Sequence, residues 1–174
     1  MILAFDTYYY ENKAKTVCVS FENWTAPETL AVFSEILEDI EEYIPGEFYR
    51  RELPCILSLY EKLPAESVEA IIVDGFVYLD DEQKPGLGKY LYEQLEQKIP
   101  VIGVAKTNFA TIERNKRPVF RGQSERPLYV TAVGIDLEDT AAKVKSMSGN
   151  YRIPDLLKQL DQLTKEIDVK ANGI

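Results

Sequence analysis

Three carboxylic acids stand where they could do chemistry together. Asp6 closes a short apolar run at the start of the chain, and Asp74 closes a later run of β-branched residues. The carboxyl ends of neighbouring parallel strands meet at one edge of a sheet, so we expect these two side chains to converge. Their charges would repel unless a divalent cation lay between them, and oxygen ligands select Mg²⁺ or Mn²⁺.

Glu52 supplies a third acid, just after the turn Ile44-Pro45-Gly46 and at the start of a predicted helix. Three acids with a cation would form a phosphodiesterase site of the two-metal type, where metal ions activate water and stabilise developing negative charge. A simpler interpretation is also open. Asp at a strand end is often a cap or turn former, and Glu in a first helical turn interacts with the helix dipole.

The composition limits the chemistry further. The chain has 174 residues, 45% of them hydrophobic, which suits one domain over residues 1–174 that folds without a disulfide or metal. It has no His, so Ser-His-Asp and Cys-His catalysis and His-ligated metals are excluded. Cys18 and Cys55 are isolated and read as buried thiols in a reducing compartment. With no signal peptide or membrane-length apolar run, we expect a cytoplasmic protein without a membrane partner.

The charge is unevenly distributed. The whole chain carries −9, yet residues 84–126 hold nine basic and four acidic side chains, a local charge of +5. This stretch could face phosphate or could be a solvated loop. The run Tyr8-Tyr9-Tyr10 could likewise stack on bases, although a mixture of core and surface tyrosines is the more ordinary interpretation.

The hydrophobic pattern predicts an α/β fold. Three antiparallel strands come first, followed by a helix around Leu53 to Tyr60 and then alternating helix and strand. The predicted segments after these are a strand over 70–74, a helix over 87–95, a strand over 101–105, a hairpin flanking Gly122, and helices from about Asp136 and Pro154. The three first strands are expected at 2–6, 16–21 and 29–33. The strand-helix-strand order implies a parallel pair, flanked by helices.

Several short blocks in this order resemble the endonuclease V family. They are Phe5-Asp6-Thr7-Tyr8, the segment Tyr-Ile-Pro-Gly at 43–46, Tyr-Arg-Arg-Glu at 49–52, Val-Asp-Gly at 73–75, Ile-Gly-Val-Ala-Lys at 102–106 and Arg-Pro-Leu-Tyr-Val at 126–130. The resemblance runs from about residue 1 to residue 160. It implies a ribonuclease H-like fold and Mg²⁺-dependent cleavage of DNA or RNA near deaminated adenine (inosine).

The resemblance also implies residue roles. Asp6 and Asp74 would hold the metal, and Glu52 would complete the acidic triad. Tyr43 would be a wedge that separates strands beside the lesion, in a turn shaped by Pro45 and Gly46. Arg51 and Lys106 would contact phosphate or the scissile group, and the backbone near Gly75 and Gly103 would approach the flipped base. Oligomeric state is left open by the sequence.

Two departures keep other functions open. The family has a catalytic His in a stretch that reads here Ala-Val-Gly-Ile-Asp-Leu at 132–137, and its loop after the second Asp is replaced at 76–85. Asp136 could substitute as a fourth acid or could cap the following helix with Asp139. The alternatives to an endonuclease are a nucleic-acid-binding relative with weakened turnover and a metal-dependent phosphohydrolase acting on another substrate.

Overall fold

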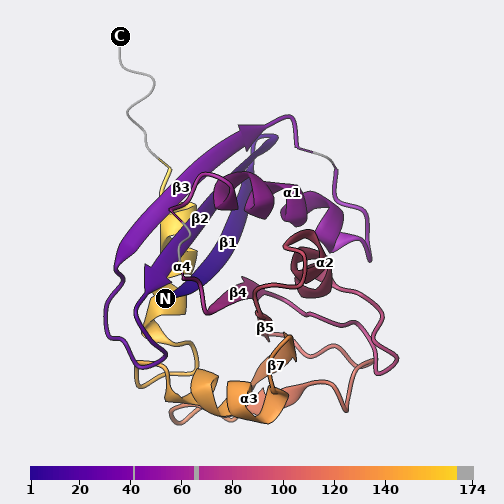
Figure 1. The fold of residues 1–174 in the computed structure, drawn as a ribbon, viewed down its shortest axis with the longest axis vertical. Coiled ribbons are helices and arrows are strands. Elements are labelled where there is room, and N and C mark those ends of the chain that lie inside the picture. The colour runs from indigo at the N-terminus through magenta and orange to yellow at the C-terminus, as the bar shows by residue number, and fades with distance from the viewer. Residues whose placement is uncertain (41, 65–66, 168–174) are drawn as a thin grey trace.

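The computed structural model describes residues 1–40, 42–64 and 67–167, and in them a mixed seven-stranded sheet lies between two layers of helices (Figure 1). The strands are β1 (Ile2–Tyr10), β2 (Lys13–Phe21), β3 (Ala31–Glu38), β4 (Ala70–Asp74), β5 (Val101–Ala105), β6 (Arg117–Val119) and β7 (Leu128–Val133). The helices are α1 (Phe48–Tyr60), α2 (Leu87–Gln94), α3 (Leu137–Ser146) and α4 (Asp155–Lys165).

The sheet has the order β3-β2-β1-β4-β5-β7-β6. The strands β1, β2 and β3 are antiparallel neighbours, while β4 pairs in parallel with both β1 and β5. The two remaining strands, β7 and β6, extend the sheet in antiparallel fashion. This order confirms the predicted α/β architecture, in which three antiparallel strands precede a parallel strand-helix-strand unit.

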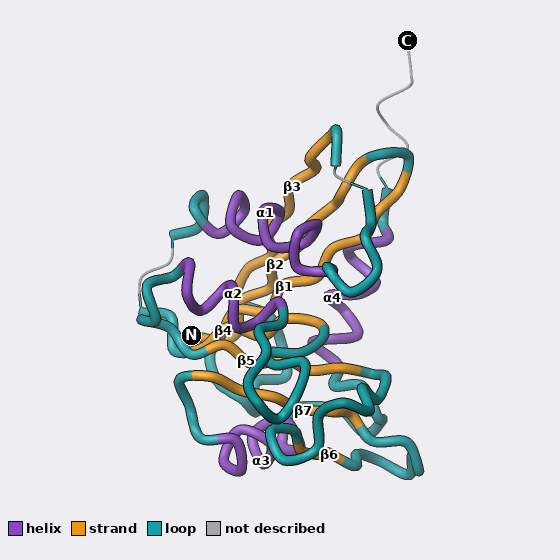
Figure 2. Tube along the Cα trace, turned by 90° about the vertical axis from the view of Figure 1, so that its right-hand side faces the viewer, coloured by secondary structure: helices purple, strands orange, loops and turns teal. Residues whose placement is uncertain are grey.

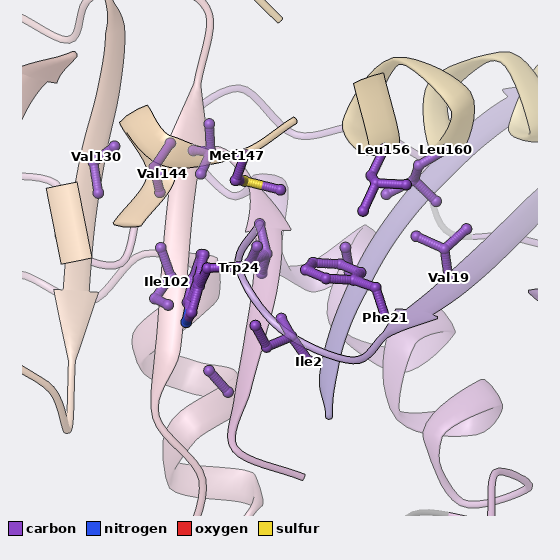
Figure 3. Close-up of a cluster of buried hydrophobic side chains, with 14 of the residues drawn as sticks. Ile2, Val19, Phe21, Trp24, Ile102, Val130, Val144, Met147, Leu156 and Leu160 are labelled. Atoms are coloured by element: carbon purple, nitrogen blue, oxygen red, sulfur yellow. The ribbon is translucent and has the colours of Figure 1, made fainter. Parts of the chain in front are cut away.

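Each face of the sheet packs against its own pair of helices (Figure 2). Side chains of α1 and α2, among them Ile56 and Leu91, join Phe5 in one apolar cluster. On the other face α3 and α4 cover a second cluster, in which Leu156 and Leu160 pack near Phe21 (Figure 3). The alternation of side chains along the strands produces these two cores, since successive residues point to opposite faces.

The bounds of the first three strands differ from the sequence prediction, and the second begins at Lys13 instead of Thr16. The first strand does not end at Asp6 but continues to Tyr10, because β2 pairs with it along its whole length. The third strand covers Ala31–Glu38 instead of residues 29–33. It is an edge strand with alternating exposed and half-buried residues, so it lacks the continuous apolar run that marks a buried strand.

A buried arginine organises the connection from α3 to α4. Arg121 is 5% exposed, and its guanidinium donates hydrogen bonds to five backbone carbonyl oxygens, those of Lys145, Met147, Gly149, Tyr151 and Arg152. Three of these oxygens belong to the end of α3 and the residues just after it, where carbonyls lack partners within the helix. Arg121 therefore fixes the segment that leads into α4.

Cys18 and Cys55 are free, buried thiols, as predicted. None of the helices within the described ranges is both long and apolar enough to cross a membrane.

Candidate active site

The strand register places Asp6 and Asp74 side by side. The parallel pairing of β1 with β4 ends at Phe5 opposite Val73, and the two aspartates are the next residues on their strands. Asp74 is also the last residue of β4. The predicted convergence is therefore present, although Asp6 lies within β1 and not at its end.

Glu52 approaches the pair from the α1 side. It is the fifth residue of α1 and is 1% exposed, so it is not a first-turn residue facing solvent. Its atom Oε1 is buried and has no hydrogen-bond partner among the described residues. A buried carboxylate oxygen without a partner is costly, so this oxygen would gain from a cation or a water molecule beside it.

A fourth acid, Asp161, comes from α4 and was not predicted from the sequence. Together with Asp6, Asp74 and Lys106 it lines a cavity of about 40 Å³. The other lining residues are apolar and include Phe5 and Leu160. A volume of this size holds a cation or a few water molecules. No motif around Asp161 marks it in the sequence; its helical spacing from Leu157 and Leu160 shows only that it borders the buried face.

The pKa values of Asp6, Glu52 and Asp74 are all raised, because these acids are buried and close to other acids. Burial raises the pKa of Asp6 to about 7, and the charge of Asp74 adds to the rise. Burial raises the pKa of Glu52 well above its usual range, with Asp6 and Asp74 contributing. Burial also raises the pKa of Asp74, which Asp161 reinforces and the Lys106 ammonium opposes. The carboxylates would thus gain from a cation that neutralises them.

The donor set fits a hard divalent cation. Carboxylate oxygens are the ligands that Mg²⁺ and Mn²⁺ prefer. The unpartnered Oε1 of Glu52 is available as a metal ligand close to Asp6 and Asp74. In the described residues, however, no three acidic or Cys side chains already form a metal-binding cluster. A cation held by three of these acids would therefore require them to approach one another more closely than they do here.

We expect Asp6→Asn to stabilise the metal-free protein at neutral pH. A carboxyl whose pKa is raised by folding contributes stability that is present below about pH 4 and lost as the pH rises to about 7. Asn has no such titration, so the variant should exceed the wild type by the order of 2 kcal/mol at pH 7.5 and match it near pH 4. Urea unfolding in EDTA at both pH values measures this difference. Glu28→Gln, in an exposed loop, is the control, and equal stability of Asp6→Asn and wild type at pH 7.5 would contradict the prediction.

Comparison with known proteins agrees with this geometry. The endonuclease V family model matches residues 1–162. The chain belongs to the endonuclease V family. An endonuclease V of Streptomyces avermitilis is 27% identical over 143 residues, a region that covers 71% of this chain and 60% of that protein. The chain thus spans less than two thirds of the length of this relative.

Solved endonuclease V structures share the fold, which is ribonuclease H-like. The Ciona intestinalis protein, solved with a 24mer DNA containing an inosine followed by a ribo-adenosine, has a TM-score of 0.75 and 17% identity, over 94% of this chain and 83% of that one. Human endonuclease V has a TM-score of 0.71 and 21% identity, over 94% and 82% of the two chains. The S. avermitilis structure gives 0.71 and 22%, over 94% and 78%.

Arg51, which an endonuclease V resemblance assigns to phosphate contact, is half-buried. Its guanidinium carbon lies 3.5 Å from the centre of the Tyr9 ring, a cation–π contact. Its Nε and the Tyr9 hydroxyl are both buried without a hydrogen-bond partner in the part of the chain that is described. Arg51 is therefore not a free surface residue, and only its outer nitrogens are candidates to meet a substrate.

Tyr43 is exposed and directly precedes the turn over residues 44–47. The amide of Glu47 donates to the carbonyl of Ile44 at 2.9 Å, and Gly46 has a φ of +82°. Pro45 and Gly46 thus occupy the positions that a type II turn favours for these residue types. Tyr43 is 53% exposed and borders a second cavity of about 340 Å³, which Arg51 and Tyr10 also line.

The two glycines near the site have different functions. Gly75 directly follows Asp74, has a φ of +102°, and would have open space around a Cβ apart from Phe48 at 4.0 Å. A ligand can therefore approach its backbone. A Cβ on Gly103 would instead lie 2.5 Å from the carbonyl oxygen of Gly75 and 2.6 Å from Thr131 Oγ1. The expectation that Gly103 admits a base is thus wrong: its missing side chain lets the loop after β4 pack on β5.

Asp136 caps a helix and lies outside the acidic cavity. Its Oδ1 accepts a hydrogen bond from the Asp139 amide at 2.9 Å at the start of α3. The capping interpretation is therefore confirmed, and the third acid that lines the cavity, beside Asp6 and Asp74, is Asp161.

The basic stretch of residues 84–126 does not form one free cationic surface. Arg121 is buried, and Lys89, Lys98 and Arg117 pair with glutamates. Lys106 is the member of the stretch that reaches the carboxylate cavity. Phosphate contact is therefore expected at the cavity and not along the whole stretch.

Proposed function

We propose that this chain is a divalent-metal-dependent endonuclease that hydrolyses a phosphodiester near deaminated adenine in DNA or RNA. The observation that carries the proposal is the convergence of Asp6, Asp74 and Asp161 on one cavity, with the unpartnered Glu52 oxygen beside them. Three acids on one cavity, with Glu52 close enough to Asp6 and Asp74 for their charges to raise its pKa, repel one another, and such a cluster has no evident structural benefit. Membership of the endonuclease V family supports the reaction class.

Each residue of the site would have its own function in cleavage. A bound Mg²⁺ or Mn²⁺ would supply positive charge that acidifies water and offsets charge on the phosphate. Asp6 and Asp74 would hold it, with Glu52 and Asp161 as further ligands or as acceptors that orient the attacking water. Lys106, exposed at the cavity rim, would pair with a non-bridging phosphate oxygen.

We assign substrate recognition to Tyr43, Arg51 and Gly75. Tyr43 would occupy the place of a displaced base, since an aromatic ring can replace lost stacking, and Arg51 would support the backbone next to it. The open backbone at Gly75 would let the extruded base approach closely. Support for inosine as the lesion comes from the Ciona relative, which was solved with inosine-containing DNA.

Cleavage of end-labelled oligonucleotides tests the substrate. Inosine-containing DNA and RNA are compared with matched adenosine versions in Mg²⁺, Mn²⁺ and EDTA, with Asp6→Asn as the inactive control. We expect metal-dependent cleavage at one position beside inosine, lost in the variant. Binding without cleavage would favour the weakened relative instead, and cleavage of all substrates alike would contradict the inosine assignment.

Asp161→Asn should lower the single-turnover rate by roughly 10- to 1,000-fold, because it removes one charge from the cavity without changing its shape. The matched control is Asp136→Asn, which makes the same chemical change at a helix cap where Asn serves equally well. We expect that control to retain the wild-type rate. Equal rates for Asp161→Asn and the wild type would remove Asp161 from the site.

A further inference from the structure

Two tyrosines and two lysines share one face of the sheet next to the acids. Tyr8 lies opposite Lys15 and Tyr10 opposite Lys13 in the antiparallel pairing of β1 with β2. Directly opposed residues point to the same face, and alternate residues of a strand do likewise. Asp6 therefore lies on the same face as Tyr8 and Tyr10. We call the set Tyr8, Tyr10, Lys13 and Lys15 the tyrosine–lysine face.

The two rings are arranged for stacking. Their centroids are 6.1 Å apart and their planes differ by 19°. Tyr8 is 37% exposed and Tyr10 half-buried, so the face is open to solvent. Tyr9 points to the opposite side, where its ring carries Arg51 and its hydroxyl is buried. Of the three tyrosines, two are thus available to a ligand and one belongs to the interior.

The helix that covers this side of the sheet ends at the edge of the face. The ammonium of Lys15 donates to the carbonyl oxygen of Leu163 at 2.8 Å and to that of Glu166, at the carboxyl end of α4. On its other edge β1 loses its partner β4 after Phe5, so its last five residues extend beyond the parallel sheet. The face begins where α4 and β4 both end.

The face joins two parts of the candidate active site. At one end Asp6 belongs to the acidic cavity, and at the other Tyr10 lines the larger cavity beside Tyr43 and Arg51. A strand that leaves the acidic cavity and follows β1 from Asp6 toward the hairpin tip would cross both rings, because Asp6, Tyr8 and Tyr10 alternate onto one face. Its bases would meet them in sequence.

The charges around the face favour unpaired bases over a duplex. Lys13 pairs with Glu38 at 3.3 Å, Lys15 is engaged by α4, and Glu11 lies at the hairpin tip. Lys165 is bound to Asp161. This balance of charge gives little of the phosphate attraction that dominates duplex binding. Stacking on aromatic rings is available only to bases that are not enclosed in a duplex.

We propose that the tyrosine–lysine face binds the single-stranded flank of the nucleic acid that the acidic cavity would cleave, by stacking of bases on Tyr8 and Tyr10. The inference rests on the proposed nuclease function and adds to it that the strand is unpaired on one side of the scissile bond.

Paired double variants test the rings. Tyr8→Leu/Tyr10→Leu removes the aromatic faces but keeps apolar bulk, while Tyr8→Phe/Tyr10→Phe keeps them. Three single-stranded inosine oligonucleotides are compared. One has a long flank on both sides of the scissile bond, and each of the other two has one flank trimmed to a single nucleotide. For the wild type and the Phe variant we expect kcat/KM to fall roughly tenfold when one flank is trimmed. For the Leu variant, kcat/KM should not fall when that flank is trimmed. Its kcat/KM on the trimmed substrate should equal the wild-type value on the same substrate.

A second readout does not depend on cleavage. An unmodified single-stranded oligonucleotide carrying 2-aminopurine reports stacking through loss of fluorescence. The wild type and the Phe variant should quench it, and the Leu variant should not. The proposal is overturned if the Leu variant keeps the wild-type dependence on flank length or quenches equally. If no protein cleaves any substrate, the proposed nuclease function fails, and the quenching comparison still decides whether the face binds bases.

Discussion

Asp74→Asn is expected to lower the single-turnover cleavage rate by about a thousandfold or more without disturbing the fold. Asp74 lines the acidic cavity together with Asp6 and Asp161 at the end of β4, so its charge would act on any cation held there. Its backbone pairs with Val104, a contact that Asn preserves. Because burial and Asp161 raise the pKa of Asp74, removing its charge should also stabilise the metal-free protein at neutral pH. Circular dichroism and urea unfolding in EDTA verify the fold.

Asp139→Asn on α3 is the matched control for this experiment. It makes the same change on an exposed helical surface away from the cavity, and we expect the wild-type rate. A rate for Asp74→Asn within about threefold of the wild type would contradict a catalytic role for the residue.

Arg121→Met is expected to lower the free energy of unfolding by about 3–5 kcal/mol, the largest stability effect that the fold predicts. Burial has already lowered the pKa of this guanidinium, yet it has no acidic hydrogen-bond partner among the described residues and is satisfied by carbonyl oxygens. Met retains much of the apolar length but donates nothing, so those buried oxygens lose their partners. Urea unfolding at pH 7 measures the loss.

The control is Arg126→Met, a change at an exposed arginine in the same loop region. It should cost less than about 1 kcal/mol. A similarly small loss in Arg121→Met would show that water replaces the guanidinium. Because the fixed segment leads into α4, we also expect Arg121→Met to reduce cleavage at temperatures where the protein is still folded.

Local sequence patterns were sufficient to predict the acids on the strands. The apolar runs before Asp6 and Asp74 mark buried strands, and parallel neighbours bring their carboxyl ends together. The turn at Pro45 and Gly46 was equally predictable, because the two residue types favour the backbone angles of that turn. The buried position of Glu52 required the fold, since helical spacing alone also allowed a solvated first turn.

Other features depend on contacts between residues far apart in the chain, which local sequence patterns do not predict. Asp161 reaches the cavity because α4 crosses the sheet beside β1, about 150 residues later in the chain, and no local pattern encodes this contact. The full length of β1 depends on pairing with β2, so polar and aromatic residues from Asp6 to Tyr10 extend the strand beyond its apolar run. Gly103 was expected to leave space for a ligand, but the Gly75 carbonyl oxygen in the loop after β4 occupies that space.

Binding of Mn²⁺ measured by electron paramagnetic resonance tests most directly whether these acids form a metal-dependent centre. Free Mn²⁺ gives a strong signal that is lost on binding, so the amount bound per protein follows from a titration. The acidic cavity predicts saturable binding by the wild type, displaced by Mg²⁺ and strongly weakened in Asp74→Asn and Asp6→Asn but not in Asp139→Asn. Absence of binding by the wild type, or equal binding by all four proteins, would contradict the metal centre.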